Sequence, residues 1–135
     1  MSDPNKNRDL VIRFYNAIYQ QDYALLRDLA RPDYIQHNPH FETGIEGLIR
    51  TLMSRPQRGP NSPPVQALEF VRTVSEGDLV VTLRKVPVPP NAPTGAEKAN
   101  VDFFRVQDGK IAEHWDYMET FPRDALPPKH TNGYF

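Results

Sequence analysis

The chain has 135 residues, with 16 basic and 17 acidic side chains, a net charge of -1 and no cysteine. This length fits one domain with a single core. The balanced charge argues against nucleic-acid binding, and the lack of cysteine excludes disulfides, thiol catalysis and zinc–thiolate sites. No apolar run approaches the ~20 residues that cross a membrane, and the polar start, MSDPNKNRD, does not resemble a signal peptide. We therefore expect a cytoplasmic protein.

The first third of the chain has the patterns of two helices and a strand. Asp3 followed by Pro4 is typical of a helix start, and an apolar stripe at helical spacing continues that helix to about residue 19. Asp22 can cap a second, short helix. A short strand is predicted at residues 34–37.

A third helix and two loops follow. Thr43 and Glu46 have the spacing of a capping box, which predicts the start of an amphipathic helix over residues 45–53. Prolines cluster at residues 55–64 and 87–93. Both clusters are predicted loops, because proline cannot donate to a sheet and restricts the residue before it.

The second half of the chain has the patterns of strands. Residues 65–74 and 79–86 are joined by a short turn, which predicts a hairpin. A second hairpin is predicted at residues 101–118, with its turn at Asp108 and Gly109.

Three helices followed by about four long antiparallel strands indicate an α+β fold, with the helices on one face of a meander. A strongly curved sheet backed by helices encloses a cone, and the interior of the cone is a natural pocket. We expect a single domain over residues 1–135, in which residues 121–135 form an irregular tail because they show no periodicity.

The second hairpin holds the densest group of titratable residues. Asp102 lies on its first strand, and Glu113, His114 and Asp116 lie on its second. Alternation places His114 and Asp116 on one face of that strand, with Glu113 and Trp115 on the other. If the first of these faces points into a pocket, the hairpin carries an acid/base site; if it points to water, it is an ordinary polar strand face.

Other polar residues have less certain directions on the sequence alone. Thr82 and Arg84 share one face of their strand, and we expect Arg84 to point outward as a solvated charge. His37 is expected to face the cavity and His40 to lie in a loop. No two histidines have the helical spacing of an H-E-x-x-H site, so we expect no metal.

These residues also form recognisable motifs. Residues 34–39 read YIQHNP, residues 43–52 read TGIEGLIRTL, and residues 104–116 follow the pattern F-R-V-x-D-G-K-I-x-E-H-W-D. Over about residues 9–120 the chain resembles the SnoaL-like polyketide cyclase family of the nuclear transport factor 2-like (NTF2-like) superfamily. The resemblance implies a cone-shaped, curved antiparallel sheet packed against three N-terminal helices, also described as a cystatin-like α+β barrel. It also implies a homodimer formed through the open sheet face.

The resemblance implies a chemistry as well. The family's cyclases close a ring by intramolecular aldol condensation, without a metal or a cofactor. Asp116 matches their acid/base aspartate, and Asp102 stands where they usually have a histidine. Asp102 would supply a proton if its neighbours kept it neutral, and His114 would bind the substrate or tune Asp116. A solvated or purely structural role remains the alternative for each.

The substrate implied by the resemblance is a small, hydrophobic carbonyl compound. Asn38 can orient a carbonyl but cannot remove a proton. Simple core packing remains the alternative for the apolar members of the predicted substrate-binding set. That set consists of His37, Asn38, Phe14, Ile18, Tyr34, Leu52, Met53, Phe104 and Trp115.

Related ketosteroid isomerases provide a contrast. Aligned with residues 13–39, their catalytic base falls on Asn38 and their oxyanion-hole tyrosine on Phe14, while their second acid falls on Asp102. With two of these three groups replaced, isomerisation by that mechanism is not expected.

Other functions stay open on the sequence alone. One is a non-catalytic module that binds small molecules or forms dimers. Another is an isomerase or an epoxide-type hydrolase on the same cone. The hydrolase requires an Asp-Arg-Asp arrangement, for which Asp102, Arg84 and Asp116 supply the residue types.

Overall fold

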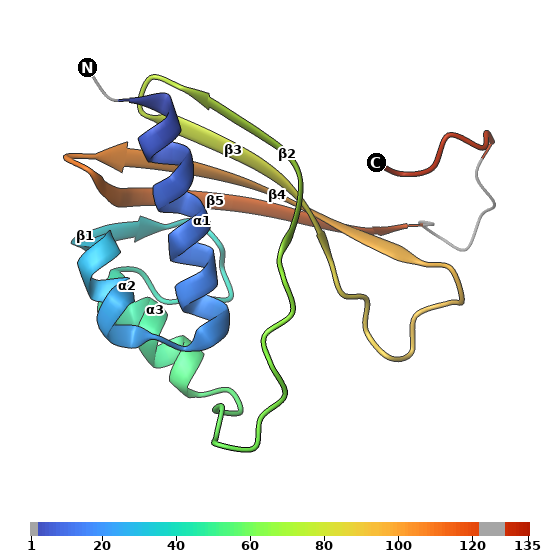
Figure 1. Cartoon of the computed structure of the whole chain (residues 1–135), viewed down its shortest axis with the longest axis horizontal. Coiled ribbons are helices and arrows are strands. Elements are labelled where there is room, and N and C mark those ends of the chain that lie inside the picture. Colours follow the sequence, from blue (N-terminus) through green and yellow to red (C-terminus); the bar gives the residue numbers. More distant parts are fainter. Residues whose placement is uncertain (1–2, 122–128) are drawn as a thin grey trace.

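The computed structural model describes residues 3–121 and 129–135. Three helices come first, with one strand between the second and third, and four strands complete the chain (Figure 1). None of the described helices is both long and apolar enough to cross a membrane. The elements are α1 (Pro4–Gln20), α2 (Tyr23–Leu29), β1 (Ala30–Gln36), α3 (Ile45–Met53), β2 (Glu69–Glu76), β3 (Leu79–Val86), β4 (Glu97–Gln107) and β5 (Lys110–Phe121).

The strands form one curved sheet in the order β1-β5-β4-β3-β2. Neighbours from β2 to β5 are antiparallel, as expected, while β1 adds a parallel edge beside β5. Figure 1 shows α1 lying across the sheet, with α2 and α3 beside it. The predicted α+β cone is confirmed, because helices cover one face of a curved sheet.

Local signals place the first two helices. Asp3 accepts a hydrogen bond from the Asn5 backbone N–H at 3.0 Å and Pro4 opens α1, as predicted. Asp22 accepts from the Leu25 backbone N–H at 3.0 Å and so caps α2. Each cap satisfies a backbone donor that has no partner inside its helix.

The predicted capping box of α3 is wrong. The residue before α3 is Gly44, whose φ of 79° favours glycine, and no side chain caps the helix. The Thr43 hydroxyl turns towards β1 instead, donating to the Tyr34 carbonyl at 3.3 Å and accepting from the Gln36 N–H at 3.2 Å. Because the hydroxyl is used on the strand, it ties the loop after β1 back onto β1.

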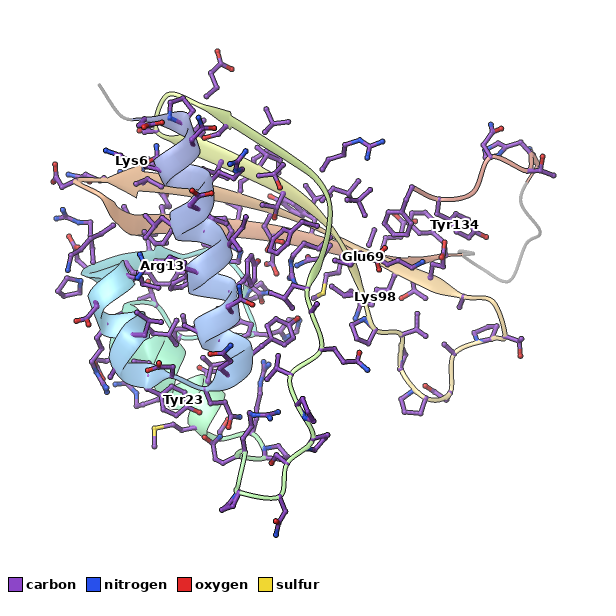
Figure 2. The ribbon with its side chains drawn as sticks, in the orientation of Figure 1. Lys6, Arg13, Tyr23, Glu69, Lys98 and Tyr134 are labelled. Atoms are coloured by element: carbon purple, nitrogen blue, oxygen red, sulfur yellow. The ribbon has the colours of Figure 1, made fainter. Side chains whose placement is uncertain are left out.

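Several boundaries differ from the sequence-based prediction. The strand predicted at residues 34–37 is β1 and begins at Ala30, and the strand predicted from residue 101 is β4 and begins at Glu97. The strand predicted from residue 65 begins at Glu69, where pairing with β3 starts. Within the predicted tail, Phe121 is the last residue of β5, residues 122–128 lie outside the described residues, and residues 129–135 contain no helix or strand. Tyr134, labelled in Figure 2, stacks on Phe121 with ring centroids 4.9 Å apart.

The core lies between α1 and the sheet, where side chains fill the space in Figure 2. Phe104 is fully buried at its centre, with ring centroids 6.0 Å from Phe14 and 5.4 Å from Tyr15. These edge-to-face contacts hold α1 against β4, which fixes the distance between the helix and the polar residues of the sheet.

The cap of α2 provides a test of this local analysis. Replacing Asp22 by alanine leaves the Leu25 N–H without its acceptor, so we expect a loss of about 1 kcal/mol in the free energy of unfolding. Urea denaturation measures it. Asp28→Ala, on the exposed side of the same helix, is the matched control, and equal losses in the two variants would contradict the capping role.

Candidate active site

The face of the sheet that the helices cover carries a group of polar residues. Strand register places them in three cross-strand rows on β3, β4 and β5. The rows are Val80–Phe104–His114, Thr82–Asp102–Asp116 and Arg84–Asn100–Met118. His114 and Asp116 therefore share the face that the helices cover. Of the two alternatives given for the hairpin, the structure has the one in which this face points inward and not to water.

Asp102 is the centre of the group and is 0% exposed. Its two carboxylate oxygens accept hydrogen bonds from side chains of α1, β3, β4 and β5. The donors are the Tyr15 hydroxyl, Thr82 Oγ1 at 3.3 Å, Arg84 Nε at 3.2 Å, Asn100 Nδ2 at 3.0 Å and His114 Nε2 at 3.0 Å.

These donors keep Asp102 ionised. Burial alone would raise the pKa of Asp102, but the His114 hydrogen bond, the Arg84 charge and the Tyr15 hydrogen bond together hold that pKa below its usual range. The same burial, with the charge of Asp102, raises the pKa of Tyr15, so the phenol remains a donor. A neutral Asp102 that supplies a proton is therefore not what this environment favours.

The outward direction predicted for Arg84 is wrong. Its side chain is buried, with Nε bonded to Asp102 and Nη1 donating to the Tyr19 hydroxyl at 3.3 Å. The guanidinium also lies 3.9 Å from the centre of the Tyr15 ring, close enough for a cation–π contact. A buried carboxylate requires a partner of opposite charge, and Arg84 supplies it.

His114 connects Asp102 to β1. Its Nε2 lies 3.0 Å from Asp102, and its Nδ1 lies 2.9 Å from Gln36 Oε1. Gln36 Oε1 also accepts from the Asn38 backbone N–H at 3.0 Å, which fixes the orientation of the amide. Each ring nitrogen faces an acceptor of the protein, so a hydrogen on either nitrogen is engaged within the protein and His114 has no N–H left for a substrate.

A cavity of about 470 Å³ lies between the helices and the inner face. Asp116 contributes to its wall, and no described residue donates a hydrogen bond to the buried Asp116 Oδ1. A carboxylate oxygen of Asp116, one of Asp102 and a ring nitrogen of His114 lie within 4.8 Å of one another. The two carboxyl groups therefore form a close pair, in which only Asp116 has an unused buried oxygen.

Most predicted site residues contribute to this cavity. Asp102 does not; it lies behind the wall and acts through its neighbours. The predicted residues in the wall are Phe14, Ile18, Tyr34, Asn38, Leu52, Phe104, His114 and Asp116.

Three predicted substrate-binding residues lie elsewhere. His37 bonds to Glu113 at 2.8 Å and stacks on Trp115 with centroids 4.7 Å apart. Trp115 and Glu113 alternate with the inward-facing His114, so both are on the outer face of the sheet. Ile35 lies opposite Glu113 in the pairing of β1 with β5, and His37, two residues after Ile35, is on the same outer face. Met53 is 57% exposed at the end of α3.

The close group Asp102, His114 and Asp116 does not fit a metal ion. The Asp102 oxygens already accept from five side chains, one of them the Arg84 cation. Each His114 nitrogen already lies within 3.0 Å of an oxygen of the protein, Asp102 Oδ1 or Gln36 Oε1, so neither is free to bind a metal. Only Asp116 remains as a ligand.

Sequence reasoning missed three polar residues of the site. Tyr15, Gln36 and Asn100 all make hydrogen bonds in the network around Asp102 and His114. Period-two alternation from Asp102 would have placed Asn100 on the inward face. Tyr15 and Gln36 had no comparable signal, because their roles depend on how α1 and β1 meet the sheet.

The Asp102 network predicts a large stability effect. Asp102→Asn removes the anion that Arg84 and His114 are buried against, so we expect a loss of about 3–5 kcal/mol in the free energy of unfolding. Asp108→Asn is the control, because its ion pair with Arg31 is exposed and worth at most ~1 kcal/mol. Equal losses would contradict the network.

The stability difference between wild type and Asp102→Asn should depend on pH. Since the folded pKa of Asp102 lies below its unfolded value of about 3.9, its contribution is fully present above that value and is lost as the pH falls through the folded pKa. The stability difference between wild type and Asp102→Asn should therefore shrink below about pH 4. Chemical denaturation from pH 7 to pH 3 measures it, and a difference that grows on acidification would contradict the assignment.

The fold recurs in solved structures with different names. The proposed polyketide cyclase IdmH from Streptomyces antibioticus is 24% identical, with 84% of this chain and 91% of that chain covered and a TM-score of 0.60. A proposed ketosteroid isomerase from Kribbella flavida DSM 17836 is 17% identical, with coverages of 96% and 87% and a TM-score of 0.67. An LEH-like epoxide hydrolase of M. tuberculosis is 19% identical, with coverages of 87% and 86% and a TM-score of 0.64. At these identities the likeness establishes the fold alone.

A search of curated proteins found no match. The comparison with family models does establish the family. Residues 11–114, which run from α1 to His114 on β5, match the SnoaL-like domain family. The resemblance noted in the sequence is thus confirmed at the level of the family, and the chain belongs to the SnoaL-like domain family.

Proposed function

We propose that this protein is an acid/base enzyme that acts on a small, hydrophobic carbonyl compound, and that Asp116 is its base. One observation carries the proposal: Asp116 contributes to the cavity wall, and its buried Oδ1 receives no hydrogen bond from a described residue. Asp102, directly opposite Asp116 on the neighbouring strand, is saturated with donors. A carboxylate that lies at the wall of a largely apolar cavity and is not saturated with donors is suited to removing a proton.

The proposed reaction is an intramolecular aldol ring closure. Asp116 takes a proton from the carbon next to one carbonyl, and the C–H electron pair forms an enolate. The enolate carbon attacks a second carbonyl carbon of the same molecule, so a C–C bond forms and a C=O π bond becomes an alkoxide. Asp116 then returns its proton to the alkoxide. No atom or electron is gained or lost, and one carboxyl group serves as base and then as acid.

The apolar walls support a hydrophobic substrate. Phe14, Ile18 and Leu52 contribute to the cavity from α1 and α3. A cavity of about 470 Å³ is in the range of small-molecule sites. An open cavity also favours binding or catalysis over a scaffold whose cone is filled by its own side chains.

We also propose the homodimer that the family resemblance implies. The outer face of the sheet exposes large apolar side chains, including Val74, Phe103 and Tyr117, and an exposed apolar patch is typical of an interaction surface. Light scattering in solution measures the molar mass, and a mass of twice the 15.5 kDa chain would support the dimer. The cytoplasmic location stays a prediction.

Proton abstraction can be tested without the natural substrate. The probe is 2-tetralone, a bicyclic ketone whose exchange of α-hydrogens for deuterium is followed by NMR in D₂O. Asp116→Asn removes the base, so we expect the catalysed exchange rate to fall about 10²–10⁴-fold. Asp28→Asn, on the exposed surface of α2, is the control. Full exchange activity in a folded Asp116→Asn protein would refute the assignment.

Ring closure requires its own assay. We expect the protein to convert 2,6-heptanedione to the cyclic aldol product 3-hydroxy-3-methylcyclohexanone, detected by NMR, and Asp116→Asn to remove this activity. Exchange without ring closure would support an isomerase on the same site. Binding of 2-tetralone with neither activity would support the non-catalytic binding module.

An epoxide hydrolase is the second candidate, favoured by one observation. Asp102, Arg84 and Asp116 come together, with Arg84 bonded to Asp102 and Asp116 opposite Asp102 in the sheet. Among the described residues, however, Arg84 donates to Asp102 and not to Asp116. Hydrolysis of styrene oxide to the diol, lost in Asp116→Asn, would favour this candidate over the aldol enzyme.

A further inference from the structure

Most polar groups around the cavity are already engaged. Asp102 is surrounded by five polar side chains, and both ring nitrogens of His114 face acceptors of the protein. When a carbonyl compound loses an α-proton, negative charge moves onto its oxygen, and that oxygen requires a hydrogen-bond donor. The donor therefore has to come from another residue of the wall.

The directions of the hydrogen bonds at Gln36 identify a donor. The Asn38 backbone N–H can only donate, so the Gln36 atom 3.0 Å away from it is the carbonyl oxygen. The amide nitrogen of Gln36 then lies 2.9 Å from the Tyr34 hydroxyl oxygen and has only hydrogens to offer. Tyr34 is the acceptor in this bond, which leaves its own hydroxyl hydrogen available.

Tyr34 is in position to use that hydrogen in the cavity. Its side chain is buried and contributes to the cavity wall, and no described residue accepts a hydrogen bond from its hydroxyl. Burial raises the pKa of Tyr34, and the charges of Asp116 and Asp102 raise it further, against a smaller opposing effect of Gln36. The phenol therefore keeps its proton at neutral pH.

The backbone around Tyr34 is held from two sides. Its carbonyl accepts from the Gly44 N–H at 2.7 Å and from the Thr43 hydroxyl at 3.3 Å. Gln36 lies opposite His114 in the pairing of β1 with β5. A donor fixed in this way needs no rearrangement when charge develops on a substrate oxygen.

We propose that Tyr34 donates its phenolic hydrogen to the carbonyl oxygen of the substrate, and that Gln36 is a positioning residue that keeps this hydrogen directed at the cavity. The ligand class is a ketone whose oxygen lies at Tyr34 while its α-carbon lies at Asp116. This inference rests on the proposed carbonyl chemistry. Asn38 and Tyr19, also in the wall, are other neutral donor candidates. The Tyr19 hydroxyl accepts from Arg84 in the same way, and the Tyr34 variants below separate Tyr34 from both.

Binding of a matched pair of probes tests the donor. 2-Naphthol resembles the enol of 2-tetralone, and naphthalene has the same rings without the oxygen. Tyr34→Phe keeps the ring and removes the hydroxyl, so we expect its Kd for 2-naphthol to rise about tenfold or more and its Kd for naphthalene to change less than about twofold. Unchanged 2-naphthol affinity, or equal weakening for both probes, would overturn the proposal.

Gln36→Glu tests the direction of the hydrogen bond. A glutamate has two acceptor oxygens, so it can still accept from Asn38 and His114 while Tyr34 now donates to it. The hydroxyl hydrogen is then withdrawn from the cavity although Tyr34 remains in place. We expect 2-naphthol binding to weaken about as much as in Tyr34→Phe, and the double variant to show no further loss. Additive losses would overturn the positioning role.

Kinetics separate this proposal from the proposed function. In the 2-tetralone exchange assay, we expect Tyr34→Phe to lower kcat more than it raises KM, since the oxygen carries more charge in the transition state than in the ketone. If Asp116→Asn keeps full activity while the probe results hold, the assigned base fails and the donor stands. If Asp116→Asn is inactive while Tyr34→Phe matches wild type in kcat and 2-naphthol binding, only the donor fails.

Discussion

The buried carboxylate of Asp102 is the constraint on which the rest of the structure depends. An anion with no solvent contact is tolerated only when nearby groups replace its hydration. The groups that do so come from different elements: Tyr15 from α1, Arg84 from β3 and His114 from β5. Through His114 and Gln36 the same network reaches β1. One charge thus sets the relative positions of the helix, the sheet and the edge strand.

Asp102 and Asp116, which share the row Thr82–Asp102–Asp116, have the same side chain but different surroundings, and their roles differ for that reason. Asp102 and Asp116 are direct partners across β4 and β5. Asp102 is surrounded by donors and is committed to structure, whereas Asp116 keeps an oxygen without a donor at the cavity wall. Pairs of carboxyl groups placed in unlike surroundings are a common way to separate a structural or ionic role from an acid/base role.

Much of the fold could be predicted from local signals in the sequence, but less of the candidate site could. The caps Asp3 and Asp22 were predictable because each contacts a backbone group a few residues away. The direction of Arg84 was not, because its reason to be buried lies 18 positions along the chain, at Asp102. His37 was placed on the wrong face, since the face of an edge strand depends on which strand it joins and in which register. Alternation on β5 needed no such information and placed His114 and Asp116 together.

The placement of β5 between β1 and β4 has a consequence for folding. Gln36 and His114 are 78 positions apart, so their contact costs loop-closure entropy that slows its formation. β5 pairs with both β1 and β4, and it carries Asp116 as well as His114. Any opening of the sheet that releases β5 therefore removes the proposed base and the partner of Gln36 in one step.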